Sequence, residues 1–415
     1  MRAKYVAPIS RDTVDPTSIS GEVIHYSIPA LEATGSPVRE LASEIESGKL
    51  VVRAGDILVS KLNPRKSRVH IVPSDGDVPT ISSSEFVVFR PRLVHGPYLA
   101  YAMSSAQSTQ WFSANTRSVT RSHQRVEPSV VGDLEVPDLT LDVQRQIADY
   151  LDAQTAKIDA LIGKQEQLIQ TLAERRQAVI SHAVTKGLDP NAPMKDSGVV
   201  WLGAVPRSWR LSSLKRLIRS QASGTSVNAM DVPAEGDEVG VLKTSSVSTG
   251  VFVPSENKTV IEADISRVTT PVESGSILVN RANSPERVGA AALVRESAPN
   301  LYLSDKIWQL SFERADAGWL YWWLQTATYR DQVSSLRVGT SSSMQNLSYE
   351  DFREIRIAVA PQAEQRRIAY YLDHETSKID ALSAKAREMI DVLKERRQAL
   401  ISAAVTGKID VRGLA

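Results

Sequence analysis

Two short polar loops carry the densest sets of side chains that could contact a polar or charged ligand. They span residues 117–125 and 338–346 and align at a constant spacing of 221 residues. Arg, Gln, Asn, Ser and Thr side chains hydrogen-bond to base edges and phosphates, so this composition predicts contact with DNA. A solvated surface turn has a similar composition, and that alternative stays open. The candidates are Arg117, Arg121, His123, Gln124 and Arg125 in the first loop and Ser341, Ser342, Gln345 and Asn346 in the second.

Basic side chains gather upstream of each loop, where an apolar run ends. Beside a strand end, such residues could position a phosphate backbone. Loose clusters of this kind are also common on surfaces that bind nothing. The candidates are Lys61, Asn63, Arg65, Lys66 and Arg68 in the first half, with Arg281, Asn283 and Arg287 as a thinner group in the second.

Matched strands and helices must position these side chains. In each half, a turn glycine precedes an apolar strand, a second strand follows, and an aromatic helix comes next. The two halves are therefore predicted to share a fold and to differ in surface. Trp319, Trp322 and Trp323 have helical spacing, which favours a core or interface over a base-stacking platform. The matched segments are 55–63 and 275–283, 81–89 and 301–310, and 97–112 and 318–329.

A nearly identical segment follows each module. Residues 144–185 and 365–406 share 26 of 42 positions without a gap. Both copies show the apolar spacing of a long helix, and Gly187 and Gly407 lie just beyond, where glycine commonly ends a helix. The pattern therefore predicts the order variable module, long helix, variable module, long helix.

The apolar residues of both helices follow the spacing of a coiled-coil seam. In the first helix the predicted seam is Ile147, Leu151, Ile158, Leu161, Leu168, Leu172 and Val179. In the second it is Ile368, Leu372, Ile379, Leu382, Met389, Leu393 and Leu400.

Each helix is too long to serve one small core alone. About 42 residues extend roughly 63 Å, so each helix should project or pair. We expect the two copies to pair as an antiparallel coiled coil; parallel pairing, or packing of each helix on its own module, are the alternatives. The predicted fold is α+β, with two similar mixed α/β modules at 1–140 and 188–360 and helices at 141–187 and 361–415.

Composition limits the class of protein. A chain of 415 residues suggests two or three domains, and the repeat favours two. Cysteine is absent, which indicates a reducing compartment, and no run of about 20 apolar residues occurs, so we expect a cytoplasmic protein without a membrane span. The net charge is only +1, so DNA binding would depend on local patches.

No motif predicts catalysis. The chain lacks the phosphate-binding Gly-x-x-x-x-Gly-Lys-Ser/Thr run and the Asp/Asn-Pro-Pro-aromatic turn of adenine methyltransferases. Its six His residues are scattered without metal-ligand spacing, so we expect no metal site.

The repeated helix carries a family resemblance. Each copy contains Gln-Arg near its start and Glu-Arg-Arg-Gln-Ala near its end, and each follows a variable module. This arrangement resembles the specificity subunit of type I restriction-modification systems over essentially the whole chain. The linker at 196–209 is similar to the central signature of that family. The usual Pro-Pro before the helix is present only as Val136-Pro137 and Ala360-Pro361.

The resemblance implies a division of labour. The modules would be target-recognition domains, each reading half of a bipartite site in double-stranded DNA, while the paired helices would set their spacing. Two modification (methyltransferase) subunits would assemble on the conserved regions, and restriction (translocase-nuclease) subunits would join them. The chain itself would be no enzyme and hold no cofactor; S-adenosylmethionine, ATP and Mg would belong to the partners.

Two other classes of protein remain as alternatives. A coiled-coil scaffold that binds no DNA would show the same paired helices. An enzyme with an unfamiliar site is a third hypothesis.

Overall fold

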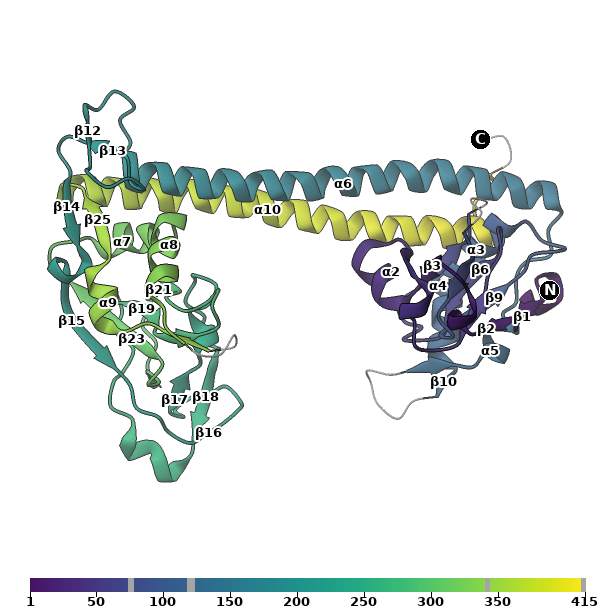
Figure 1. The fold of residues 1–415 in the computed structure, drawn as a ribbon, viewed down its shortest axis with the longest axis horizontal. Helices are drawn as coiled ribbons and strands as arrows, with labels where there is room; N and C mark the ends of the chain where they lie inside the picture. The colour runs from purple at the N-terminus through teal and green to yellow at the C-terminus, as the bar shows by residue number, and fades with distance from the viewer. Residues whose placement is uncertain (74–77, 118–123, 340–343, 412–415) are drawn as a thin grey trace. The chain divides into compact units, whose positions relative to one another are not determined.

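The computed structural model describes residues 1–73, 78–117, 124–339 and 344–411. The chain divides into two compact units. Unit 1 is Met1–Gln167 with Ala386–Ala415, and unit 2 is Leu168–Lys385. Each unit therefore combines one variable module with part of each long helix (Figure 1).

The two long helices form where the repeat predicts them. Helix α6 spans Leu141–Lys186 and α10 spans Gln362–Val405, with 46 and 44 residues. Gly187 and Gly407 follow them with φ of 81° and 73°, a left-handed conformation that glycine adopts without steric cost. The predicted stops are therefore confirmed.

The helices pair in antiparallel orientation. Unit 1 joins the first part of α6 to the last part of α10, and unit 2 joins the last part of α6 to the first part of α10 (Figure 1). Each unit has one copy of the same interhelical ion pair, with Nε to Oδ1 at 2.9 Å: Arg397 with Asp159 in unit 1 and Arg176 with Asp380 in unit 2. The members differ by 221 positions, so the helices exchange roles between the units.

Most positions of the predicted seam are buried, as a seam requires. Ten of its members are buried or pack against a core cluster: Ile147, Leu151, Ile158, Leu172, Val179, Ile368, Leu372, Ile379, Leu393 and Leu400.

The seam prediction is wrong at four apolar positions. Their exposed fractions are 46% for Leu161, 44% for Leu168, 52% for Leu382 and 49% for Met389. The residue one position later is more buried in each case: Ile162, Ile169, Ser383 and Ile390. Apolar spacing allows a step of either three or four residues at each turn, and at three of these four positions two adjacent residues are both apolar, so the pattern did not decide between them.

Unit 1 contains two sheets beside its helix pair. One is antiparallel with the order β1-β9-β6-β7, and the other has the order β2-β5-β8-β3-β4 with a parallel β3–β8 pair. The strands of the first sheet are β1 (Ile9–Ser10), β6 (Ile57–Ser60), β7 (Val69–Ile71) and β9 (Phe86–Phe89). Those of the second are β2 (Thr13–Val14), β3 (Glu22–Tyr26), β4 (Val38–Leu41), β5 (Lys49–Val51) and β8 (Thr80–Ser82). The short helices are α1 (Ala3–Val6), α2 (Ile28–Thr34), α3 (Gly96–Ser104), α4 (Ala106–Ala114) and α5 (Pro128–Gly132), and β10 (Thr116–Arg117) pairs with β11 (Arg125–Val126).

Unit 2 repeats the first of these sheets. Its order β15-β23-β19-β21 matches β1-β9-β6-β7 strand for strand, so the predicted shared fold is confirmed for this sheet. Its strands are β15 (Ile218–Ser223), β19 (Ile277–Asn280), β21 (Ala291–Leu293) and β23 (Ile307–Phe312). A second sheet has the order β16-β18-β17-β22, from β16 (Ala229–Met230), β17 (Gly240–Leu242), β18 (Asn257–Val260) and β22 (Leu301–Tyr302).

Three strand pairs and three short helices complete unit 2. The pairs are β12 (Met194–Asp196) with β13 (Ala204–Pro206), β14 (Arg210–Ser213) with β25 (Arg356–Val359), and β20 (Ala282–Asn283) with β24 (Gln345–Asn346). The helices are α7 (Ala317–Trp323), α8 (Ala327–Leu336) and α9 (Tyr349–Glu354).

The single aromatic helix predicted in each module is two helices. Ser105 separates α3 from α4, and Thr326 is the residue before α8. Their hydroxyls accept hydrogen bonds from the backbone N–H groups of Ser108 and Tyr329, at 3.2 and 3.3 Å. These caps stabilise a new helix start inside the apolar pattern, which is why periodicity alone did not show the break.

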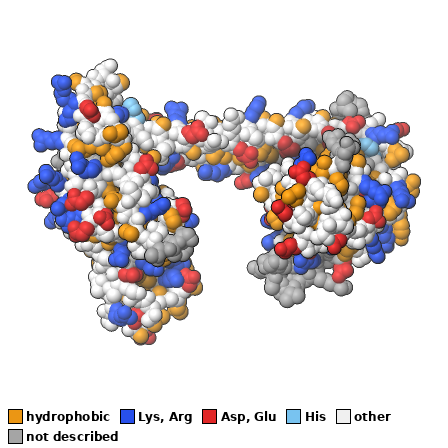
Figure 2. Space-filling model, in the orientation of Figure 1, with side chains coloured by type: hydrophobic (Ala, Val, Ile, Leu, Met, Phe, Trp, Pro, Cys, Tyr) orange, Lys and Arg blue, Asp and Glu red, His pale blue; other side chains and the backbone are white. Residues whose placement is uncertain are grey.

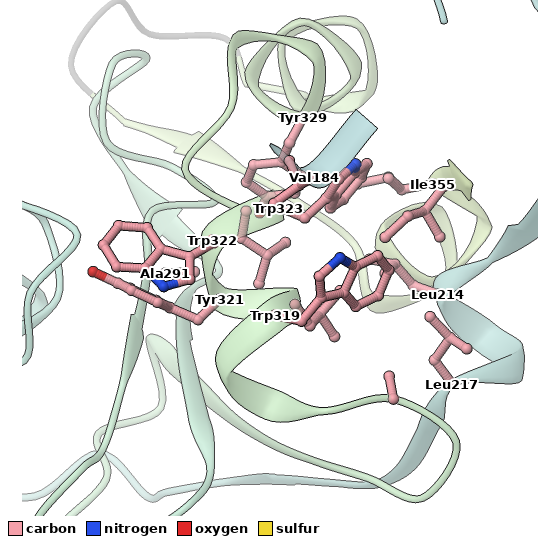
Figure 3. Close-up of a cluster of buried hydrophobic side chains, with 14 of the residues drawn as sticks. Val184, Leu214, Leu217, Ala291, Trp319, Tyr321, Trp322, Trp323, Tyr329 and Ile355 are labelled. Carbon is pink, nitrogen blue, oxygen red and sulfur yellow. The ribbon is translucent and has the colours of Figure 1, made fainter. Parts of the chain in front are cut away.

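The aromatic residues of unit 2 form its core. Trp319 and Trp323 are 0% and 1% exposed, and they pack with Tyr329 and with Val184 of α6 (Figure 3). The predicted core role of the tryptophans is confirmed. Trp322 Nε1 also donates to Asp373 Oδ1 of α10 at 2.9 Å.

A buried glutamine fastens each module to a long helix. In unit 1, Gln144 Oε1 accepts from the backbone N–H of His95 at 2.8 Å, and Nε2 donates to the Leu139 carbonyl at 2.9 Å. In unit 2, Gln365 makes the equivalent bonds to Asp316 and Ala360, both at 2.7 Å. The repeated Gln-Arg therefore supplies a docking contact for the module that precedes it.

Candidate nucleic-acid interface

In unit 1, strand pairing brings the basic strand end and the polar loop together. The backbone N–H of Asn63 donates to the Gln124 carbonyl at 2.8 Å. That of Val126 donates to the Lys61 carbonyl at 3.0 Å, and Leu62 and Arg125 form the bridge between them. Residues about 60 positions apart thus form one short antiparallel ladder.

We call this pairing of the basic strand end with the polar loop the junction. Unit 2 contains the same junction with other side chains. Strand β20 pairs with β24 in a register that sets Ala282 opposite Asn346 and Asn283 opposite Gln345. The Leu347 N–H donates to the Arg281 carbonyl at 2.8 Å. The structure therefore joins the second predicted basic group to the second predicted loop, as in unit 1.

Arg125 is held by a carboxylate at the edge of the unit 1 junction. Its Nε donates to both oxygens of Glu85 at 3.3 and 3.0 Å, and its Nη2 donates to Oε1 at 3.1 Å. This contact raises the pKa of the Arg125 guanidinium. The side chain is 52% exposed, and it contacts Glu85 through Nε and Nη2.

The charged groups of Lys66 and Arg68 already have an acidic partner within unit 1. Both form ion pairs with Glu32, and Lys66 Nζ lies 3.3 Å from Oε1. These contacts hold the pKa of Glu32 below its usual range, Arg68 contributing most. The Arg68 side chain is only 10% exposed, and its Nη1 donates to the Leu62 carbonyl at 3.0 Å. Arg68 therefore stabilises the strand end, and its predicted phosphate contact stays a prediction.

Four other basic candidates form no ion pair within the described part of the chain. They are Lys61, Arg65, Arg281 and Arg287. Arg65, Arg281 and Arg287 are exposed, and Lys61 is half-buried. Figure 2 shows basic and acidic side chains interspersed on the face in view, which agrees with the near-zero net charge. Phosphate binding would therefore depend on these local positions.

Several loop candidates fall outside what the structure describes. Arg121, His123, Ser341 and Ser342 lie in the ranges 118–123 and 340–343. Of Arg117, only the backbone is described, in β10. Among the rest, Asn283 Nδ2 donates to Ser248 Oγ at 3.3 Å, and Gln345 Nε2 donates to the Gly339 carbonyl at 3.4 Å.

The structure leaves out residues 74–77, 118–123, 340–343 and 412–415. The residues that it describes contain no cluster of three or more His, Asp or Glu able to hold a metal ion. Among those same residues, no helix has both the length and the apolar character needed to cross a membrane.

No protein-family model matches the chain, whereas curated proteins and solved structures are similar to it. The chain is 25% identical over 242 residues to the specificity subunit of the type I restriction enzyme EcoEI of Escherichia coli, a match covering 58% of this chain and 40% of that protein. Its fold is similar to a chain in a structure on the complex assembly and conformational transition of the type I R-M system, with a TM-score of 0.74, 19% identity and coverage of 99% and 97%. In sequence the chain is thus similar to a type I specificity subunit, and in fold it is similar to a chain of a type I R-M system.

A second solved structure supports the family fold. The HsdS subunit from Thermoanaerobacter tengcongensis gives a TM-score of 0.51 at 20% identity, covering 99% of this chain and 96% of that one. The matched segments span 40% and 62% of the curated relatives EcoEI and EcoBI, both below two thirds of their length. The similarity therefore consists of a distant sequence match over part of these relatives and a fold shared over the whole chain.

Sequence reasoning missed the acidic residues beside the basic candidates of unit 1. Glu85 and Glu32 hold the candidate cations, yet neither lies in a loop that was singled out. Glu85 lies within the matched segment 81–89 and directly precedes β9, but its counterpart at the 221-residue spacing is Lys306, so the repeat did not single it out. Glu32 lies on α2, and nothing in the sequence linked that helix to Arg68.

Proposed function

We propose that this chain is the DNA-reading specificity subunit of a type I restriction-modification complex. Modules 1–140 and 188–360 would each read one half of a bipartite site, and segments 141–187 and 361–415 would serve as spacer and docking platform. The observation that carries the proposal is the repeated junction of strand end and polar loop. Its backbone is shared by both units, while its side chains differ, as expected of two readers with different targets.

The energetics of recognition favour two linked modules. A good bidentate base contact contributes about 1–3 kcal/mol of discrimination, so a small module reading a few base pairs selects weakly. When two modules are linked, the second binding event becomes intramolecular and the affinity for a correctly spaced double site rises. A paired helix that holds both modules provides such a linkage.

The surface of the helices supports two identical protein partners. Leu161 and Leu382 are half exposed, and so are Leu168 and Met389. The members of each pair are 221 positions apart. Exposed apolar side chains favour protein contacts, and a duplicated set favours two like subunits. We assign this surface to two methyltransferase subunits, with restriction subunits joining through them.

Catalysis then belongs to those partners, with S-adenosylmethionine, ATP and Mg as their cofactors. A complex that modifies the cell's own DNA would work in the cytoplasm.

Footprinting of the chain reconstituted with its methyltransferase partner tests the proposal. We expect two protected half-sites separated by an unread gap, with affinity that falls as salt rises. Arg125→Ala should weaken selection at one half-site, and Gln345→Ala with Asn346→Ala should weaken it at the other. One continuous recognition sequence, or equal effects of both changes on both half-sites, would contradict the two-reader assignment.

The scaffold alternative makes a different prediction in the same experiment. A coiled-coil scaffold that binds only proteins would show no sequence-dependent affinity for DNA at any salt concentration. Turnover of S-adenosylmethionine by the isolated chain would instead favour an enzyme.

A further inference from the structure

In unit 2, a single loop carries the basic-group candidates for DNA contact. It spans residues 281–290, between β19 and β21, and the candidates are Arg281, Asn283 and Arg287. The Gly289 N–H donates to the Asn280 carbonyl at 2.7 Å, and the Asn280 N–H donates to the Ala290 carbonyl at 2.9 Å. These two bonds tie the ends of the loop together. The first part of the loop contains β20, which pairs with β24 at the junction.

Two arginines hold the second part of this loop by its backbone carbonyls. Arg330, on α8, donates from Nη1 to the Val288 carbonyl at 2.6 Å and from Nη2 to the Glu286 carbonyl at 2.9 Å. Arg337, directly after α8, donates from Nη1 to the Pro285 carbonyl. A guanidinium carries its N–H donors in a fixed planar fork, which lets Arg330 hold two carbonyls at once. Because a carbonyl is neutral, these contacts neutralise neither arginine.

Near its end, the loop packs tightly against α8 at Gly289. The Tyr329 hydroxyl donates to the Gly289 carbonyl at 2.6 Å, and burial raises the pKa of that hydroxyl, so it stays a donor. Gly289 has φ of 75°, and a Cβ there would lie 2.8 Å from Val333 Cγ1, so this close approach requires glycine. Together with the two arginines, Tyr329 engages four of the five carbonyls from Pro285 to Gly289.

The counterparts of these three side chains in unit 1 make different contacts. At the 221-residue spacing they are Ser108, Thr109 and Thr116. Their hydroxyls donate to carbonyls of residues 102, 105 and 113, within the segment of α3 and α4. By contrast, contacts that fasten each module to a long helix, those of Gln144 and Gln365, recur in both units. The α8 contacts therefore belong to the part of the second module that differs from the first, as the side chains of the junction do.

In unit 1 the equivalent loop is held through its charged groups instead. Lys66 and Arg68 form ion pairs with Glu32 of α2, so a carboxylate offsets their charge. In unit 2, α8 holds the backbone of the loop and leaves the Arg287 side chain exposed. An exposed cation on a fixed backbone is suited to a phosphate at a defined position, because binding then requires little further ordering of the loop.

We propose that Arg330 is a positioning residue for recognition of the second half-site. It fixes the backbone of residues 285–289 so that Arg287 meets the phosphates of the DNA in one register. Arg330 acts through the loop, since both of its Nη groups are engaged by loop carbonyls. This role rests on the proposed function, and it assigns a part in recognition to a helix outside the basic groups and polar loops.

A double-mutant cycle on the chain reconstituted with its methyltransferase partner tests this role. Arg330→Lys keeps the charge and loses the fork, and Arg287→Ala removes the phosphate contact, so each should weaken binding to the target duplex by about fivefold or more. Because both changes act on the same contact, the double variant should bind within about twofold of Arg287→Ala. Independent effects would multiply to about 25-fold, and that result would overturn the proposal. Fluorescence anisotropy of a labelled duplex at fixed salt measures the affinities.

Two controls separate positioning from a loss of folding. Base selection at the half-site read by module 1–140 should stay unchanged in every variant, whereas general unfolding would weaken both half-sites. Arg314→Lys makes the same exchange at an exposed position of unit 2 and should leave the affinity unchanged. If Arg330→Lys weakened selection at both half-sites equally, its role would be structural and the proposal would be wrong.

Hydrogen exchange without DNA tests the loop contact independently of the proposed function. The amides of residues 286–289 should exchange faster in Arg330→Lys than in the unaltered chain, and unchanged exchange would show that the loop does not depend on Arg330. The two possible failures are distinguishable. Absence of sequence-dependent binding by the unaltered complex would refute the proposed function and the role in recognition with it. Specific binding by the unaltered complex, with multiplying effects of Arg330→Lys and Arg287→Ala, would refute the positioning role alone.

Discussion

Replacing Gln144 with Ala should detach the first module from its long helix. The side chain is 1% exposed and bridges two backbone groups, the His95 N–H at 2.8 Å and the Leu139 carbonyl at 2.9 Å. Alanine would leave both groups buried without a partner. Each such group costs about 1–3 kcal/mol, so the expected loss is about 2–6 kcal/mol in the free energy of unfolding.

The internal repeat provides a replicate of this experiment. Gln365 makes the same two bonds in unit 2, to the Asp316 N–H and the Ala360 carbonyl, both at 2.7 Å. Gln365→Ala should therefore destabilise unit 2 by a similar amount. Gln167 is exposed on α6, and Gln167→Ala should change stability by less than about 0.5 kcal/mol.

Urea unfolding followed by far-UV circular dichroism measures the loss, and hydrogen exchange at the amides of α3 and α7 locates it. We expect faster exchange in α3 for Gln144→Ala and in α7 for Gln365→Ala. A loss below about 0.5 kcal/mol for both variants, equal to the Gln167 control, would show that water replaces the amide and that the buried bridge does not stabilise docking.

Three further predictions concern the junction and the helices. Glu85→Gln should weaken the ion pair with Arg125 and alter base selection at one half-site only. Binding to DNA variants at fixed salt measures the selection. Unchanged selection would show that Glu85 does not position Arg125. Ile390→Ala should lower the free energy of unfolding by about 2–5 kcal/mol and Met389→Ala by less than about 1 kcal/mol, measured by thermal unfolding. The reason is that Ile390 is 7% and Met389 49% exposed. A larger loss for Met389→Ala than for Ile390→Ala would support the seam expected from the sequence. One heptad inserted into each of α6 and α10 should change the number of base pairs between the half-sites without changing the bases read; a footprint of unchanged spacing would contradict the spacer role.

Much of the architecture was predictable because it depends on local periodicity. The length of α6 and α10, their glycine stops and the strand before each basic group all follow from short-range pattern. The break at Ser105 was not predictable from periodicity, since one buried hydroxyl overrides an apolar run that spans both helices.

The candidate interface was predicted in composition and only partly in arrangement. The pairing of Asn63 with Gln124, and of Asn283 with Gln345, was not visible in the sequence, because strand pairing joins residues about 60 positions apart. The sequence also gave no sign that Glu32 holds Arg68, since an ion pair depends on which surfaces the fold brings together.

The sequence by itself determined that two like modules alternate with two like helices, because a repeat is a property of residue order. Tertiary structure decided how that repeat is used. The first part of each helix docks one module through Gln144 or Gln365, while its last part packs in the other unit, as the exchanged ion pairs of Arg397 and Arg176 show. Antiparallel pairing gives repeated residues such as Asp159 and Asp380 equivalent contacts, one in each unit, and only the folded chain reveals those contacts.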